Sequence, residues 1–245
     1  MARGKKQREV EYIHRQTRNP FVVARACVRL VKDLGAPREA TIIESQFMRS
    51  RWLKKYAGWG RAADRLMLGE YNQAQLDQLP RLPNLDLDQL LATCPPGSLG
   101  YVVASHMKRC KLNPNIFREA NVRTREEYVA AHITETHDLW HVVSGFGNDE
   151  PGEIGVVAFY CAQTGLPIFI LLLAIALLNT ALYSHDKVAE RFDAISEGWL
   201  AGKRAKPLYG IDWAKQWHRP IAQVRRDLHL PERVVAGSGI FEEAA

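Results

Sequence analysis

Apolar residues recur every three or four positions along most of this chain, which is the spacing of one face of an α-helix. In the stretch 21–34 that face contains Val22, Ala26 and Leu30, and Gly35 ends it. Besides a long helix that follows Thr124, the same spacing predicts helices at 38–57, 61–69, 99–111, 185–206 and 213–230.

We therefore predict an all-α fold with one multi-helix domain over residues 21–231. A basic, flexible segment precedes it at 1–20, and a weakly ordered tail follows at 232–245. A chain of 245 residues can bury a sizeable core in one such domain. The apolar positions predicted to face inward in the last two helices are Val188, Phe192, Ile195 and Trp199, followed by Ile221, Val224 and Leu228.

Two of the predicted helices begin at capping residues. Ser98 follows Pro95-Pro96-Gly97 and is placed to cap the helix at 99–111. Thr124, with Glu127 three positions later, forms a capping box that opens a long helix continuing through His141. The length of this helix makes it the central element of the predicted domain.

The stretch from Ile154 to Ser184 contains no charged residue. Its length and hydropathy alone would nominate 166–183 as a membrane-inserted helix. Gly165 and Pro167 divide the stretch into two shorter pieces, and Asn179 lies in its second half. A helix that is apolar all round is also typical of the centre of a helical domain. We favour an apolar pair of helices that forms a lipid cavity, with membrane insertion as the alternative.

The net charge and the cysteine content indicate which classes of partner and which compartment to expect. The net charge of +6 and the pI of about 9.2 favour an anionic partner, either a membrane surface or a phosphate group. Nucleic acid is not expected, because the basic residues are interleaved with acids and no recognition motif is present. The four cysteines form no CxxC pair and indicate reduced thiols in the cytoplasm. The N-terminus does not resemble a secretory signal peptide.

Potential metal ligands are concentrated between residues 136 and 153. His137 and His141 are four positions apart, so they share one face of the long helix. Asp138 can reach the edge of that face, and Glu153 follows a Gly- and Pro-containing turn at the start of the next helix. Imidazole and carboxylate suit zinc, and also iron or manganese; we predict Zn²⁺. The alternative is a His–Asp pair on a solvated helix, which the apolar neighbours of the motif disfavour.

The sequence HDLWH followed by eleven residues and Glu153 resembles the HDxxHx11E motif of the fourth of the coenzyme Q (ubiquinone) biosynthesis proteins, the fourth Coq protein. Three further segments are similar to that family: PPGSLG at 95–100, GxxAFYxAQTGLP at 155–167 and AKPLYGIDW at 205–213. Their common order and spacing extend the resemblance over residues from about 80 to about 230.

The resemblance implies an all-helical, metal-binding protein of prenylated-quinone biosynthesis, peripheral to the inner face of a membrane. It would hold a polyprenyl lipid or prenylated quinone precursor, associate with other quinone-biosynthesis proteins and form a homodimer. Family members are regarded as organisers of a biosynthetic complex and as catalysts of oxidative C1 decarboxylation of a prenylated hydroxybenzoate. An open coordination position on the metal favours a metal-dependent decarboxylase, and a closed one favours a structural site.

Roles follow for individual residues. His137, His141 and Glu153 are predicted ligands, and Asp138 is either a fourth ligand or a proton acceptor. We interpret Lys203, Arg204 and Lys206 as contacts for a lipid phosphate or head group, or else as a solvated basic turn. His106 is interpreted as a partly buried polar residue, and His132 and Glu135 lie on the side of the long helix away from His137.

A metal-dependent hydrolase is the alternative function. HDLWH has the frame of the zincin HExxH motif with Asp in place of Glu. An HD-type phosphohydrolase would need further His and Asp ligands, for which His185-Asp186 is the one candidate pair.

Overall fold

The computed structural model describes residues 20–36, 39–40, 42–43, 66, 73–115 and 122–231 of the chain. The regular structure of these residues is helical, and no strand occurs among them. The α-helices are α2 (Pro20–Lys32), α6 (Gln73–Asp77), α7 (Leu87–Thr93), α8 (Leu99–Arg109), α9 (Arg125–Ser144), α10 (Glu150–Thr164), α11 (Pro167–Tyr183), α12 (Val188–Arg204) and α13 (Ile221–Asp227). Two 3₁₀ turns are η1 (His185–Lys187) and η2 (Trp213–Gln216).

The predicted single all-α domain is confirmed. The segments predicted before residue 20 and after residue 231 lie outside the described residues, as do most positions of the helices predicted at 38–57 and 61–69.

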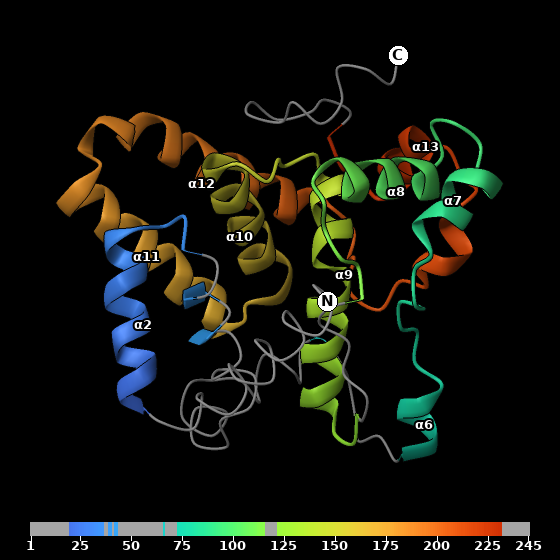
Figure 1. Cartoon of the computed structure of the whole chain (residues 1–245), viewed down its shortest axis with the longest axis horizontal. Helices are drawn as coiled ribbons and strands as arrows, with labels where there is room; N and C mark the ends of the chain where they lie inside the picture. The colour runs from blue at the N-terminus through green and yellow to red at the C-terminus, as the bar shows by residue number, and fades with distance from the viewer. Residues whose placement is uncertain are drawn as a thin grey trace, which may run out of the picture.

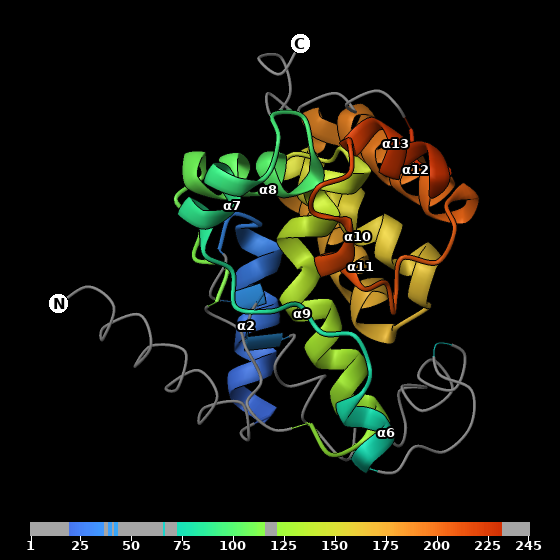
Figure 2. The same ribbon diagram turned by 90° about the vertical axis from the view of Figure 1, so that its right-hand side faces the viewer.

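The long helix α9 stands near the middle of the molecule (Figure 1). Helices α2, α10, α11 and α12 lie on one side of it, and α8 and α13 gather around its C-terminal end, as Figure 2 also shows. The predicted capping box begins this helix. The backbone N–H of Glu127 donates to Thr124 Oγ1 at 3.2 Å, and the Glu127 carboxylate accepts from the N–H of Arg123 at 2.8 Å.

The uncharged stretch is divided where Gly165 and Pro167 predicted. Helix α10 ends at Thr164, and α11 begins at Pro167, where the missing N–H of proline costs no hydrogen bond. One face of α11 is buried and contains Ile175 and Asn179, whereas Ile170 and Leu182 on the outer face are exposed. The described residues therefore do not cover the outer face of α11, and the predicted lipid cavity stays a prediction.

No helix of the described residues has both the length and the apolar composition that a membrane crossing requires.

Helices α10 and α12 pack so closely that their backbones are in contact. A Cβ added to Gly198 would lie 2.1 Å from the carbonyl oxygen of Gly155, which is closer than any real contact. A Cβ on Gly202, one turn later, would lie 2.8 Å from the carbonyl oxygen of Phe159. The two helices can lie this close because α12 presents hydrogen atoms where other residues have side chains.

This contact corrects the predicted core face of α12. Phe192 and Trp199 are 51% and 45% exposed, and the buried positions are instead Arg191, Ala194, Gly198 and Gly202. Apolar periodicity placed the larger apolar side chains of α12 in the core. The neighbouring face of small residues is buried instead, because it allows α10 to lie closer to α12 than large side chains would.

The helix predicted at 213–230 is also corrected, because it is divided into η2 and α13. Pro220 lies between them, where it has no N–H to continue a helix. The backbone there turns toward the start of α8: the N–H of Leu99 donates to Arg219 O at 2.9 Å, and the N–H of Ile221 donates to Gly97 O at 3.0 Å. Of the predicted inward positions in α13, Val224 is buried.

We expect Gly198→Ala to lower the free energy of unfolding by about 1–3 kcal/mol, because the added methyl group must displace the backbone of α10. Denaturation in urea, followed by circular dichroism, measures this change. Ser196→Ala on the exposed side of α12 is the matched control and should change stability by no more than about 0.5 kcal/mol. Equal stability of the two variants would contradict the close contact.

Candidate metal centre

Two imidazoles from the last turns of α9 meet a carboxylate from the first turn of α10. The Nε2 atoms of His137 and His141 are 3.2 Å apart, and Glu153 Oε2 lies 3.5 Å from His141 Nε2 and 3.9 Å from His137 Nε2. This is the one group in the described part of the chain whose His, Cys or carboxylate atoms converge in a way that could hold a metal ion. The predicted convergence of His137, His141 and Glu153 is therefore present.

The turn between α9 and α10 sets this geometry. Gly145 ends α9 in the left-handed region at φ 85°, where a Cβ would be strained. Phe146 then folds inward against Gly155, whose absent Cβ would lie 2.4 Å from its ring. Asp149 caps α10 by accepting from the N–H of Gly152 at 3.0 Å. The turn thus places Glu153 opposite the histidines.

The same turn orients the ring of His141. Its Nδ1 lies 3.1 Å from the carbonyl oxygen of Phe146, and a carbonyl can only accept, so Nδ1 carries the proton of this hydrogen bond. The lone pair of the neutral ring is then on Nε2, which faces His137 and Glu153. Metal-binding histidines are commonly oriented by such a backbone acceptor.

The charges of the three groups depend on one another. Burial would raise the pKa of Glu153, but the neighbouring His141 and then His137 hold it at about 2. Burial would lower the pKa of His141, yet attraction and hydrogen bonding to Glu153 raise it above its ordinary value. Burial, followed by repulsion from His141, lowers the pKa of His137. Without a cation, the carboxylate therefore favours a proton on His141.

The donor set fits a divalent metal. Tetrahedral zinc with bonds of about 2.0–2.1 Å places its ligand atoms about 3.3–3.4 Å apart, which is close to the separations of the three atoms here. His141 is fully buried, whereas the side chains of His137 and Glu153 are 38% and 46% exposed. The residues can thus hold an ion on the protein side and leave access from the other side.

Stacked aromatic rings form a wall beside the centre. The ring of His137 stacks on Tyr160 with centroids 5.9 Å apart, and Tyr160 also stacks on Trp140 at 4.3 Å and on Phe169 at 4.5 Å. Phe169 belongs to α11, so the wall connects the candidate metal centre with the apolar helix. Sequence reasoning did not include Tyr160 or Phe169, although both lie in or near the AFYxAQTGLP segment.

Asp138 is not one of the three converging groups. It is half-buried, and its negative charge contributes to raising the pKa of His141. Its role as ligand or proton acceptor stays a prediction. Lys203, Arg204 and Lys206 are exposed at the end of α12 and just after it, and their role in binding a lipid head group also stays a prediction.

His106 and His132, which were predicted to lie outside the metal site, are both buried. His132 Nε2 accepts from the N–H of Gly210 at 3.2 Å, and its neighbour Glu135 forms an ion pair with Arg81. His106 on α8 is more deeply buried than expected, and burial, followed by repulsion from His141, lowers its pKa to about 4.

Comparison with known proteins adds to this geometry. The family of the coenzyme Q (ubiquinone) biosynthesis protein Coq4 matches residues 60–233. The COQ4 homolog of Danio rerio, described as a mitochondrial ubiquinone biosynthesis protein, is 29% identical over 160 residues, which cover 64% of this chain and 57% of that protein. The corresponding protein of Pyrenophora tritici-repentis is 32% identical over 176 residues, covering 68% of this chain and 58% of its own.

A crystal structure described as a ubiquinone biosynthesis protein from Nostoc punctiforme superposes with a TM-score of 0.68 at 25% identity. The match covers 86% of this chain and 97% of that one. The chain spans about three fifths of the length of the curated relatives that it matches. Since the family match extends over most of the chain and includes every residue of the candidate metal centre, the chain belongs to the Coq4 family of coenzyme Q (ubiquinone) biosynthesis proteins.

Proposed function

We propose that this protein acts in ubiquinone-type biosynthesis by binding a divalent metal and, beside it, a polyprenyl lipid or prenylated quinone precursor. The convergence of His137, His141 and Glu153 is the observation that carries the proposal. Zn²⁺ is the proposed ion, because two neutral imidazoles and one carboxylate are a common zinc donor set. The names of the relatives from Danio rerio and Nostoc punctiforme support the biosynthetic role.

The proposed division of labour follows from exposure and charge. A bound divalent ion would supply Lewis acidity toward a carboxylate or phenolate of the substrate. His141, buried and oriented by Phe146 O, would hold the ion from the protein side. The half-exposed His137 and Glu153 leave room for the substrate ring. Asp138, on the same helix, would be the proton acceptor or a fourth ligand.

The apolar helices would bind the prenyl chain. The stack of Tyr160 and Phe169 leads from the candidate metal centre to α11. Burying an isoprenoid gains about 25 cal/mol per Å² of apolar area, so the prenyl tail would supply most of the affinity. The metal ion would orient the ring end of the ligand. Lys203, Arg204 and Lys206 would contact a lipid phosphate or head group.

The protein is proposed either as a metal-dependent decarboxylase or as a scaffold with a structural metal. In the first role it would catalyse oxidative C1 decarboxylation of a prenylated hydroxybenzoate, in which the ring loses CO₂ and gains a hydroxyl group at the expense of an external two-electron oxidant, because Zn²⁺ itself is not redox-active. In the second role it would organise other quinone-biosynthesis proteins. Peripheral binding to a membrane surface and a homodimer belong to both. The hydrolase alternative has less support, because His185 and Asp186 are exposed in η1 and join no ligand group of the described residues.

Protein purified without added metal should contain about one divalent ion per chain, and native mass spectrometry should detect an isoprenoid bound to it. His141→Ala should weaken metal binding more than about tenfold, because it removes the most deeply buried ligand. His218→Ala, at an exposed position, is the control and should keep both metal and lipid. Equal metal content in the two variants would contradict the site.

Metal affinity should depend on pH through His141. Below the raised pKa of this residue a proton competes with the metal for Nε2, so affinity should fall by about tenfold per pH unit as the pH decreases. The decline should begin above the ordinary imidazole value of 6.5, while Glu153, with its pKa of about 2, stays ionised. Zn²⁺ titrations against a competing chelator between pH 5 and about 8 test this. An affinity independent of pH would contradict the assignment of His141.

A measurement of substrate turnover distinguishes the proposed enzymatic role from the proposed scaffold role. In the presence of O₂ as oxidant, release of CO₂ from a prenylated hydroxybenzoate should require the bound metal, and Asp138→Asn should slow it by about 10²–10⁴-fold if Asp138 transfers the proton. If Asp138 is a ligand instead, the variant should also lose metal. A metal- and lipid-loaded protein that releases no CO₂ would leave the scaffold role.

A further inference from the structure

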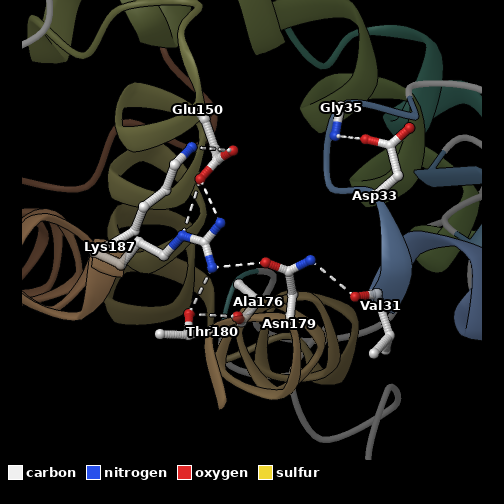
Figure 3. A network of polar contacts seen from close by, with 9 residues as sticks. Val31, Asp33, Gly35, Glu150, Ala176, Asn179, Thr180 and Lys187 are labelled. Carbon is white, nitrogen blue, oxygen red and sulfur yellow. Dashed lines mark hydrogen bonds and ion pairs between the residues drawn. The ribbon is translucent and has the colours of Figure 1, made fainter. Parts of the chain in front are cut away.

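A buried arginine joins the three helices α10, α11 and α12. Arg191 of α12 is 2% exposed, and its Nε and Nη2 donate to Glu150 Oε1 of α10 at 2.9 and 2.6 Å. Its Nη1 donates to Asn179 Oδ1 and Thr180 Oγ1 of α11, both at 2.7 Å. Figure 3 shows the partners Glu150, Asn179 and Thr180 within this network of polar contacts. All three nitrogens of the buried cation are therefore engaged.

The network continues beyond the arginine. Asn179 Nδ2 donates to the carbonyl oxygen of Val31 in the last turn of α2 at 2.8 Å, and Lys187 Nζ pairs with Glu150 Oε2 at 3.2 Å (Figure 3). Arg191 holds Glu150 from a buried position, whereas the side chain of Lys187 is substantially exposed and subject to solvent screening. The Arg191–Glu150 contact is therefore the stronger link between α12 and the start of α10.

Glu150 and Glu153 belong to the same first turn of α10 but contact different helices. Glu150 contacts Arg191 of α12, whereas Glu153 faces His137 and His141 of α9. They are three positions apart in the same helical turn, so a shift of Glu150 moves the backbone that supports the Glu153 carboxylate. The arginine network thus holds, through Glu150, the turn that presents Glu153 to the histidines of α9.

The tight packing of α10 on α12 makes this link stiff. Gly198 lies against the backbone of Gly155, two residues after Glu153, so α10 cannot slide over α12 without a clash. The ligand separations of 3.2–3.9 Å tolerate little displacement, because bonds to zinc vary by only about 0.2 Å.

We propose that Arg191 is a positioning residue of the metal centre, which acts through Glu150 to fix the first turn of α10 and thereby place the carboxylate of Glu153. This inference rests on the proposed metal-binding function. It adds a pair of residues, Arg191 and Glu150, that determine metal affinity and coordination geometry without contacting the ion.

The test measures Co²⁺ binding by the full chain, using the visible absorption bands of Co²⁺ as a report of coordination geometry. Glu150→Ala should weaken Co²⁺ binding by about tenfold and change the band positions, as expected for loss of a residue that orients a ligand. Glu150→Gln, which keeps an oxygen acceptor for Arg191, should give a smaller loss in the same direction. Circular dichroism and thermal unfolding of the metal-free proteins are recorded separately, so that a loss of folding is distinguished from a loss of Co²⁺ binding.

Lys187→Ala is the matched control, because it removes the more exposed partner of Glu150 and leaves Arg191 in place; its Co²⁺ affinity should stay within about twofold of the original chain. If Glu150→Ala does not fold, Glu150→Gln alone decides. A folded Glu150 variant with lower thermal stability but unchanged Co²⁺ affinity and spectrum would overturn the proposal. It would show that the Arg191–Glu150 pair stabilises the fold without positioning a metal ligand. If the original chain fails to bind Co²⁺, or binds it no more tightly than the His141→Ala variant does, the proposed metal-binding function itself is overturned.

Discussion

The turn between α9 and α10 is the constraint on which the candidate metal centre depends. Two imidazoles on one helix are brought together by helical spacing alone, but a carboxylate from the next helix meets them only if the chain reverses within a few residues. Gly145 permits the left-handed end of α9, and Phe146 fills the space beside Gly155. The carbonyl of Phe146 also orients His141. Helix reversal, packing and ligand orientation are therefore functions of the same short segment.

The electrostatics of the three groups follow from that reversal. A carboxylate placed against two buried or half-buried imidazoles is best compensated by a cation, either a proton on His141 or a metal ion. A proton and a metal ion would compete for the same nitrogen atom, so the proposed metal binding would be coupled to pH. The partial exposure of His137 and Glu153 is compatible with chemistry at the ion, and the aromatic wall gives the site an apolar boundary toward α11.

Local patterns were sufficient to predict the central helix, its capping box and the convergence of His137, His141 and Glu153. Metal binding by these residues and the role of Asp138 stay predictions. The local patterns were sufficient because spacing along a helix and the chemistry of short turns are properties of neighbouring residues. The inward face of α12 was predicted wrongly, because close packing selects small residues such as Gly198 over the larger apolar ones. The partnership of Arg191 with Glu150 joins positions far apart in sequence and leaves no periodic signal.

Helix α13, far from α9 in sequence, also stabilises the C-terminal end of α9. Arg225 of α13 donates from Nη2 and Nε to the carbonyl oxygens of Val142 and Val143 at 2.8 and 3.1 Å, at the negative end of the α9 dipole. During synthesis on the ribosome, α9 with His137 and His141, and then α10, emerge well before this arginine does. The carbonyl groups of Val142 and Val143 then lack the Arg225 donor, so the C-terminal end of α9 should reach its mature state only after α13 has left the exit tunnel.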